Sequence, residues 1–473
     1  MRQRLSRRLG VAWLCCVAAA GAWSEASPLA RRLDSVLADP RLATASVGCL
    51  VVDSGSRQTL YERDADRALM PASNMKLVTS LAVLHFLGAD FRYRTTLSAE
   101  GIGEGRVQGD LYLRGSGDPT LRHEDLEQLA EALVAQGVRR IEGEVVADAS
   151  CFPGPPLGAG WPWDDETYAY SAQVSGLSVD GNTVRAEITG GAHPGDPCRL
   201  GLTPLSQYLA IDPECVTGPA DAAEPVVYRR RARNVVATTG PVPAGGVVSA
   251  VITLEEPDLY AADLLRRALR AQGVEVLGEC RPGTTPPGAE PLAEHESAPL
   301  RDLLAAMNVP SDNGIAEGLL RTIPLAQGRP GTAPEATAMI ERWLPEIGVV
   351  VGPLRLCDGS GLSRLNLLTA RGVVALLQHG RTQPPFVASL PVSGTSGTLA
   401  RRMDGTVAEG RVRAKTGSLW GVSSLSGYVE GTEGAAVTFS LLMNNYRCEG
   451  TEVRQLQDRV CLALVRYVDA RER

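Results

Sequence analysis

The sequence contains very few lysines. Of its 47 lysine and arginine residues, only Lys76 and Lys415 are lysine, so the other 45 are arginine. A guanidinium stays protonated at any working pH, whereas a lysine can lose its proton when burial or a neighbouring cation lowers its pKa. Because arginine has replaced lysine almost everywhere, we interpret the two remaining lysines as positions that require an amine.

Several motifs that would indicate other chemistry are absent as well. There is no C-x-x-C spacing, and the five histidines form no H-x-x-x-H pair, so we predict neither a metal site nor a cofactor. The chain also lacks the G-x-S-x-G elbow, which argues against a triad hydrolase. A formal charge of −7 argues against nucleic acid or an anionic membrane as the main partner.

The N-terminal residues have the pattern of a secretory signal peptide. A basic segment over residues 1–8 precedes an apolar run over residues 9–20, and small residues follow. This run is too short for a spanning helix, so we predict a signal peptide over residues 1–26 and no integral membrane span. The protein is therefore expected to be exported, to the periplasm or another extracytoplasmic location.

Eight cysteines remain after the predicted signal peptide. An exported protein with an even number of cysteines can form disulfides. Cys198 and Cys215 lie close together in a loop-rich stretch and are the pair that we favour. The alternative is that several of the eight are buried free thiols.

The order of predicted elements indicates an α+β protein with an insertion. We expect strands early, a Gly/Pro-rich middle with short β-like runs, and then helices and strands. Strands and a closing helix near the C-terminus would complete a sheet that uses both ends of the chain. The predicted domains are a signal peptide, the first part of a mixed domain, one or more β-rich inserted domains and the second part of the mixed domain, over residues 1–26, 27–96, 97–298 and 299–473. The predicted elements are strands over 45–53, 59–63, 412–418, 424–430 and 435–444, and helices over 75–87, 123–136, 258–272 and 452–471.

The predicted insertion offers few functional candidates. The arginines at 229–231 and 233 are interpreted as a solvated strand face, with binding of anionic glycan strands as the alternative. Asp118, Trp161, Trp163 and Asp180 are expected to be structural rather than substrate contacts.

Three short motifs contain all the candidate catalytic residues. They are S-x-x-K from Ser73 to Lys76, S-D-N from Ser311 to Asn313, and K-T-G from Lys415 to Gly417. Each alone is common in helix caps and turns. Together, in this order and holding both lysines of the chain, they indicate the active site of a serine acyl-transfer enzyme.

The residue types suggest how such a site would work. Ser73 is a weak nucleophile until a base takes its proton, and Lys76 lies one helical turn away. Repulsion from Lys415 would help to keep the Lys76 amine neutral. Ser311 can bridge the two lysines and relay a proton to the leaving amine.

The same motifs offer groups that could bind a peptide. The side chain of Asn313 can hold the peptide backbone, and Lys415, Thr416 and Ser418 suit a terminal carboxylate. A strand edge at Gly417 and Ser418 could dock the peptide by adding a strand. The backbone N–H groups of Ser73 and Ser418 are natural donors to an oxyanion.

Longer strings resemble the D-alanyl-D-alanine carboxypeptidase/endopeptidase family of low-molecular-mass, class C penicillin-binding proteins, of the penicillin-binding protein 4 type. The similar strings lie at residues 71–76, 115–119, 175–182, 358–363 and 415–428. The resemblance implies a serine β-lactamase/transpeptidase-like domain, an antiparallel sheet flanked by helices, with β-rich insertions. It implies cleavage of peptidoglycan peptides after D-alanine and acylation by penicillins.

The resemblance also implies a role for each motif residue. Ser73 is the expected nucleophile and Lys76 the expected base, and Ser311 and Asn313 supply the second motif. Residues 415–418 (Lys415, Thr416, Gly417 and Ser418) bind substrate. It leaves open whether carboxypeptidase or endopeptidase activity dominates, and whether the protein forms a homodimer.

Two other functions stay open. A serine β-lactamase shares the chemistry, but the sequence has no Glu-x-x-Leu-Asn string to position a deacylating water. A non-catalytic cell-wall binding protein could keep the fold, yet Ser73, Lys76 and Lys415 are all intact.

Overall fold

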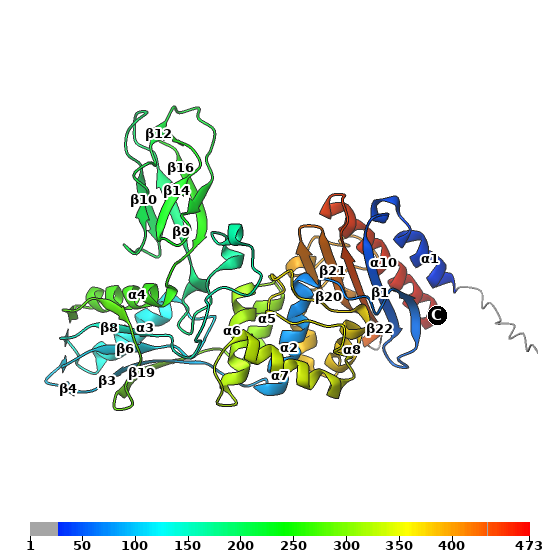
Figure 1. The fold of residues 1–473 in the computed structure, drawn as a ribbon, viewed down its shortest axis with the longest axis horizontal. Helices are drawn as coiled ribbons and strands as arrows, with labels where there is room; N and C mark the ends of the chain where they lie inside the picture. Colours follow the sequence, from blue (N-terminus) through cyan, green and yellow to red (C-terminus); the bar gives the residue numbers. More distant parts are fainter. Residues whose placement is uncertain (1–26, 433) are drawn as a thin grey trace, which may run out of the picture.

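The computed structural model describes residues 27–432 and 434–473, and the predicted signal peptide lies outside these residues. Within the described ranges, no helix is long and apolar enough to cross a membrane. The molecule is elongated, with a large mixed sheet-and-helix part at one end and a β-rich part at the other (Figure 1).

The main sheet joins the two ends of the described chain (Figure 1). Its five strands are antiparallel and run in the order β2-β1-β22-β21-β20. Their bounds are β1 Ser46–Asp53, β2 Thr59–Arg63, β20 Val412–Leu419, β21 Val422–Gly431 and β22 Gly434–Asn444. Strand β1 is buried over nearly its whole length, because helices cover both faces of the sheet. Strand β20 lies at the edge.

Helices pack on both faces of this sheet. One face is covered by α10, which α1 contacts in turn, and the other by α8, with α2, α5, α6 and α7 beyond it (Figure 1). The bounds are α1 Pro28–Leu37, α2 Met75–Phe86, α5 Leu300–Asn308, α6 Asn313–Leu325, α7 Ala333–Trp343, α8 Ala370–Gly380 and α10 Gly450–Glu472. The predicted α+β fold, an antiparallel sheet flanked by helices, is therefore confirmed.

The middle of the chain leaves this part through β3 (Arg94–Ala99) and returns through β19 (Glu290–Glu296), which pair with each other. They belong to a five-stranded sheet, β18-β8-β6-β3-β19, beside a four-stranded sheet, β17-β7-β5-β4. Helices α3 (His123–Ala135) and α4 (Pro257–Ala271) pack together on this part. The other strands are β4 Ile102–Gly103, β5 Arg106–Val107, β6 Leu111–Arg114, β7 Arg140–Ile141, β8 Val145–Asp148, β17 Glu275–Val276 and β18 Cys280–Pro282.

A small lobe of short strands projects from this middle part (Figure 1, top). It contains the sheets β10-β9-β16, β11-β14-β13 and β12-β15. Its strands are β9 Thr183–Thr189, β10 Arg199–Thr203, β11 Ala210–Ile211, β12 Thr217–Gly218, β13 Val227–Arg229, β14 Val235–Thr238, β15 Val242–Pro243 and β16 Val247–Thr253. We propose that residues 97–298 form the insertion, because β3 and β19 lie side by side at its two ends. We call residues 97–298 the inserted part and the remainder the catalytic part.

Most of the predicted elements are present with small shifts of their ends. The strands near both termini and the helices predicted over 123–136, 258–272 and 452–471 are all confirmed. Helices α1, α7 and α8 were not predicted. Each is short and begins just after a Ser or Thr N-cap, and its buried face forms only against a distant segment.

The favoured disulfide is absent. The eight cysteines in the part of the chain that the structure describes are all free thiols. Cys198 and Cys215 are both buried, with Cys198 Sγ 3.9 Å from Thr217 Oγ1 and Cys215 Sγ accepting from Thr238 Oγ1 at 3.6 Å. The structure agrees with the alternative, that several of the eight cysteines are buried free thiols.

The predicted solvated face of arginines is wrong for Arg229. Its side chain is only 1% exposed and forms ion pairs with Glu166 and Glu255. In β13, Val227 and Arg229 point to the same buried side, while Arg231 beyond the strand is exposed. Arg229 therefore contributes to the packing of the inserted part.

The other singled-out residues of the inserted part have protein partners. Asp118 caps its own turn at Thr120, and Asp180 is ion-paired. Trp163 is 69% exposed, whereas Trp161 Nε1 donates to Asp358 Oδ2 at 3.0 Å in the catalytic part. Trp161 therefore ties the inserted part to a loop of the catalytic part.

Candidate active site

The first motif lies where a short 3-10 turn, η2 (Ala72–Asn74), enters α2. Ser73 is in the turn and Lys76 in the first turn of the helix, so their side chains share a face. Lys76 Nζ donates to Ser73 Oγ at 3.2 Å. The predicted nucleophile and base are therefore within hydrogen-bond reach.

The Lys76 amine is fully buried, and all its hydrogen-bond acceptors are uncharged. Besides Ser73, it donates to Asn313 Oδ1 at 2.6 Å and to the carbonyl oxygen of Ser360 at 2.8 Å. Burial lowers the pKa of Lys76 to about 8, against the opposing charges of Asp358, Asp312 and Glu317. About a tenth of the amine is then neutral at pH 7 and available as a base, far more than for an exposed lysine.

The second lysine lies across the site on β20. Lys415 is fully buried, and its Nζ donates to Ser311 Oγ at 2.8 Å and to the carbonyl oxygen of Thr416 at 3.1 Å. Burial and the charge of Lys76 hold the pKa of Lys415 well below its usual range. The sequence predicted that repulsion from Lys415 helps to keep Lys76 neutral. In the structure burial lowers the pKa of Lys76, and the repulsion acts on Lys415 instead.

Ser311 is held in an unusual backbone conformation at the start of α6. Its φ of 71° is in the left-handed region, which costs a non-glycine residue of order 1–3 kcal/mol. The next residue, Asp312, caps α6 by accepting from Ile315 N at 2.8 Å. In this conformation the Ser311 hydroxyl accepts from Lys415. Lys76 donates to Asn313 in place of the predicted contact with Ser311.

Asn313 joins the base to the inserted part. Its Oδ1 accepts from Lys76, and its Nδ2 donates to the carbonyl oxygen of Tyr170 at 2.8 Å. In the structure both ends of this side chain therefore have protein partners. Its predicted role of holding the substrate backbone stays a prediction.

The end of β20 passes directly against the nucleophile. A Cβ at Gly417 would lie 3.0 Å from the Ser73 nitrogen and 2.7 Å from the Pro71 carbonyl oxygen, so only glycine fits. This close approach brings the backbone of Ser418 beside that of Ser73. The hydroxyl of Thr416 bonds to that of Thr398 at 2.8 Å.

Asn74 was not singled out from the sequence, yet it joins the motifs. It is fully buried, and its Nδ2 donates to the carbonyl oxygen of Lys415 at 2.9 Å. Its Oδ1 accepts from Ser426 Oγ at 2.6 Å, on the neighbouring strand β21. The residue following the nucleophile thus fixes the distance from η2 to β20.

Two adjoining cavities open at Ser73, Ser311 and Ser418. The larger, about 550 Å³, has walls from both parts of the chain. The inserted part supplies Pro162, Asp164, Asp165 and Tyr170, and the catalytic part supplies Asn313, Gly361, Leu362, Arg364, Leu419 and Trp420. Apart from Asn313 and the strings at residues 358–363 and 415–428, no sequence pattern indicates these walls, because they come from segments that only the fold brings together.

The smaller cavity, about 360 Å³, lies along the other side of the β20 end. Its lining includes the hydroxyls of Thr398 and Thr416 and two arginines, Arg402 and Arg454. Arg402 is paired with Asp458 at 2.6 Å. This side of the nucleophile is therefore polar and basic, which suits a carboxylate.

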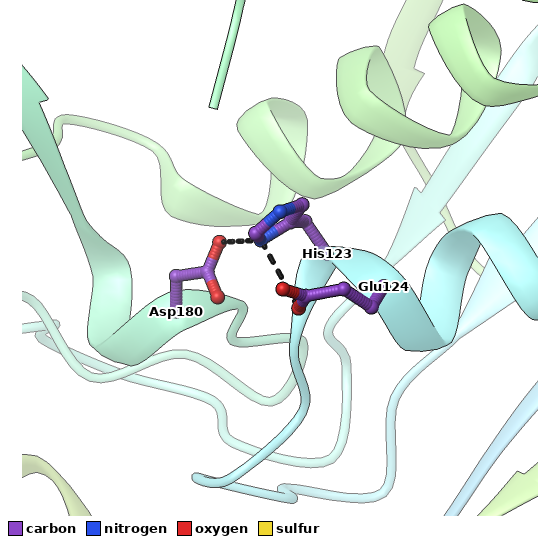
Figure 2. Close-up of side chains that lie close together, drawn as sticks. All are labelled: His123, Glu124 and Asp180. Atoms are coloured by element: carbon purple, nitrogen blue, oxygen red, sulfur yellow. Dashed lines mark hydrogen bonds and ion pairs between the residues drawn. The ribbon is translucent and has the colours of Figure 1, made fainter. Parts of the chain in front are cut away.

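A separate cluster of titratable side chains lies in the inserted part (Figure 2). His123 Nδ1 is 2.9 Å from Asp180 Oδ2 and 3.3 Å from Glu124 Oε2. The guanidinium of Arg122 lies 3.2 Å from the other oxygen of Asp180. Because a cation of the protein already faces these carboxylates, we interpret the cluster as an ion-pair network that fixes the start of α3.

Solved structures share this architecture. Penicillin binding protein 4 (dacB) from Haemophilus influenzae superimposes with a TM-score of 0.81 and 26% identity, over 92% of this chain and 98% of that chain. The same protein complexed with a novel β-lactam gives a TM-score of 0.76 and 25% identity, over 92% of this chain and 99% of that one.

Curated relatives match over most of the chain. The D-alanyl-D-alanine carboxypeptidase of Actinomadura sp. (strain R39) is 41% identical over 456 residues, 92% of this chain and 84% of the relative. The D-alanyl-D-alanine carboxypeptidase DacB of Haemophilus influenzae is 30% identical over 417 residues, 85% of this chain and 86% of the relative. The sequence model of the D-Ala-D-Ala carboxypeptidase 3 (S13) family matches residues 29–466. With the fold and all three motifs in place, this chain belongs to the D-Ala-D-Ala carboxypeptidase 3 (S13) family.

Proposed function

We propose that the protein is a serine D-Ala-D-Ala carboxypeptidase and/or endopeptidase that acts on peptidoglycan peptides through an acyl-enzyme at Ser73. The observation that carries this proposal is the contact of the Lys76 amine with the Ser73 hydroxyl, at 3.2 Å, at the base of a cleft. The Ser311–Lys415 pair, at 2.8 Å, faces it from the opposite side. Relatives named as D-alanyl-D-alanine carboxypeptidases support the same activity.

Acylation begins when neutral Lys76 takes the proton of Ser73. The Ser73 oxygen attacks the carbonyl carbon of the penultimate D-alanine and forms a tetrahedral intermediate. The N–H groups of Ser73 and Ser418 can stabilise its oxyanion, since Gly417 lets the two backbones approach closely. Collapse breaks the peptide bond and leaves an ester on Ser73.

The second lysine acts on the leaving side. Ser311 can give a proton to the departing amine of the terminal D-alanine and take one from charged Lys415, to which it is bonded. A terminal carboxylate bound at Thr416 and Ser418 would favour the charged form of Lys415. The charged Lys415 would in turn favour neutral Lys76, so substrate binding itself would promote the base. Water then attacks the ester carbonyl and gives a proton through Ser311 to Lys415. Lys76 returns to Ser73 the proton that it took, which regenerates the enzyme.

The proposal can be tested by intact-protein mass spectrometry after incubation with benzylpenicillin. Wild type, Ser73→Ala and the control Ser35→Ala, an exposed serine on α1, would be compared. We expect a stable adduct on wild type and on the control, and none on Ser73→Ala. Release of D-alanine from a peptide ending in D-Ala-D-Ala would follow the same pattern.

Two other results would replace this proposal. Consumption of penicillin without a stable adduct on wild type would indicate a serine β-lactamase. Neither adduct nor consumption would indicate a non-catalytic cell-wall binding protein.

We also propose that the protein is exported to the periplasm or another extracytoplasmic location, where its peptide substrate occurs. Residues 1–26 support this as a signal peptide by their sequence pattern alone. N-terminal sequencing of protein secreted by an expressing bacterium would locate the cleavage site. A homodimer stays a prediction, to be checked by light scattering of the purified protein.

A further inference from the structure

A buried carboxyl group lies directly behind the base and has no part in the mechanism above. Glu317 is fully buried on α6, one turn after Asn313. Its Oε1 accepts from the backbone nitrogens of Gly359, at 2.9 Å, and Ser360, at 2.8 Å. Its Oε2 is buried without a hydrogen-bond partner among the described residues. Burying a carboxyl oxygen without a hydrogen-bond partner costs free energy.

The two residues that Glu317 holds are also in contact with α2. The carbonyl oxygen of Ser360 accepts from Lys76 Nζ at 2.8 Å, and that of Gly359 accepts from Thr79 Oγ1 at 2.7 Å. The segment therefore donates its N–H groups to Glu317 on one side and offers its carbonyls to the base helix on the other. Glu317 is thus connected to the base through one backbone segment.

Close packing prevents this segment from moving freely. A Cβ at Gly359 would lie 2.7 Å from the carbonyl oxygen of Ala316 on α6. A Cβ at Gly361, whose φ is +84°, would lie 1.9 Å from the carbonyl oxygen of Ala72, next to the nucleophile. The segment is clamped between α6 and the Ser73 turn, so a change at Glu317 would be transmitted to the Lys76 contact.

The charges around Glu317 can be specified. Burial raises the pKa of Glu317 to about 7, the charge of Asp358 adds to this, and hydrogen bonding from Ser360 and the guanidinium of Arg321 oppose it. Asp358 is itself held by donors of its own loop and by Trp161. Lys76 lies close by, and its pKa is lowered by burial and raised in turn by the charges of Asp358, Asp312 and Glu317.

We infer that Glu317 is a positioning residue for the base: it fixes the Ser360 carbonyl against Lys76 Nζ and places a negative charge behind the amine. This inference rests on the proposed function, because it assigns Lys76 as the base. A negative charge behind the amine favours its protonated form, while the carbonyl contact keeps the amine aimed at Ser73. When it is charged, Glu317 therefore makes Lys76 harder to deprotonate, while its hydrogen bonds keep the amine in a fixed position.

The test is the pH profile of acylation by a chromogenic β-lactam in Glu317→Gln. Glutamine keeps an oxygen for the two N–H groups but carries no charge, so Lys76 loses its proton more easily. Because the pKa of Glu317 is itself raised to about 7, its charge acts on Lys76 mainly above that pH. We expect acylation at pH 7.5 to be roughly 1.5-fold faster in Glu317→Gln than in wild type, and the two profiles to converge below about pH 6.5.

A matched variant separates charge from geometry. Thr79→Val removes the bond to the Gly359 carbonyl without changing any charge. We expect acylation to slow several-fold with the acid limb in its wild-type place. Glu317→Leu removes both the hydrogen-bond acceptor for Gly359 and Ser360 and the negative charge. It should slow acylation by roughly ten-fold or more at every pH, which is a larger effect than that of Thr79→Val.

The outcomes are distinguishable. If wild type is acylated normally and Glu317→Gln has the wild-type rate at pH 7.5, the inferred effect of the Glu317 charge is overturned while the proposed function stands. Because that variant keeps the shape of the side chain, it decides the question even if Glu317→Leu does not fold. A wild type that is not acylated at all would overturn the proposed function and this inference together.

Discussion

The catalytic part and the inserted part both bury basic side chains, but they surround them with different partners. In the inserted part, Arg229 forms ion pairs with Glu255, at 2.6 Å, and Glu166, at 3.2 Å. In the catalytic part, Lys76 and Lys415 are equally buried, and their acceptors are hydroxyl, amide and carbonyl oxygens.

The difference distinguishes a cation that stabilises the fold from an amine that can accept a proton in the reaction. A buried cation with carboxylate partners stays charged, and its removal leaves uncompensated charges behind. A buried amine with neutral partners is pushed towards its neutral form, which is the form that can accept a proton. Arginine suits the first environment and lysine the second, which gives a physical reason for the distribution of basic residues in this chain.

The largest expected effect comes from placing an arginine in the lysine environment. Lys76→Arg keeps the positive charge but removes the group that can take the proton of Ser73. We expect the acylation rate constant for benzylpenicillin to fall by roughly 10³-fold, in the range that general bases contribute. Stopped-flow or gel-based labelling with a fluorescent penicillin measures this.

The reciprocal variant is the control. Arg229→Lys keeps a cation between Glu166 and Glu255, so its acylation rate should match that of wild type. Comparable losses in both variants would contradict the distinction between the two environments, and would indicate that each acts only through folding.

The next effect is on stability and falls in the inserted part. Arg229→Met leaves the half-buried Glu255 without this cation and Glu166 with only the exposed Arg231, which lies 3.2 Å from it. We expect a cost of about 3–5 kcal/mol in the free energy of unfolding. We expect a lower urea midpoint and an unchanged acylation rate for the molecules that remain folded. Adding Glu255→Gln to this variant should restore part of the stability, and no recovery would argue against the ion pairs as the cause.

Much of the site could be predicted because its motifs are local. The position of Ser73 before a helix fixes Lys76 one turn away, and the strand pattern after Val412 places Lys415 in a sheet. Both inferences depend only on neighbouring residues. The structure brings these residues to within 3.2 Å of their partners.

The rest depends on contacts between distant segments. Asn74, Glu317 and Ser360 act through partners far along the chain, and no spacing in the sequence indicates those pairs. Arg229 is different, since alternation with Val227 in a strand could have indicated a buried side chain. The run of neighbouring arginines made a solvated face the simpler interpretation, and the buried carboxylates that pair with it lie on other segments.

A smaller effect concerns pH, and it follows from the neutral surroundings of Lys76. Since its pKa is lowered to about 8, the base is fully available only above that pH. We expect the acylation rate to rise with pH through about 8 and to be roughly ten-fold below its maximum at pH 7. Rate constants measured from pH 5.5 to 9.5 test this, and a flat profile would show that the proton is taken by another group.

The smallest effect is expected where the two parts meet. Trp161 Nε1 donates to Asp358 Oδ2, so the inserted part contributes one bond to the loop that carries the Ser360 carbonyl. Trp161→Phe removes that bond, while Asp358 keeps its partners in the loop, including Ser363 N at 2.7 Å. We expect a loss of about 1–2 kcal/mol in stability and a roughly three-fold slower acylation.

Trp163→Phe is the matched control, because Trp163 is 69% exposed and contacts Arg231 through its ring. It should change neither quantity. If Trp161→Phe also leaves acylation unchanged, then the inserted part shapes the cleft only through its walls at residues 162–170. If it slows acylation as expected, then the inserted part is not purely structural, because its Trp161 also supports the loop behind the base.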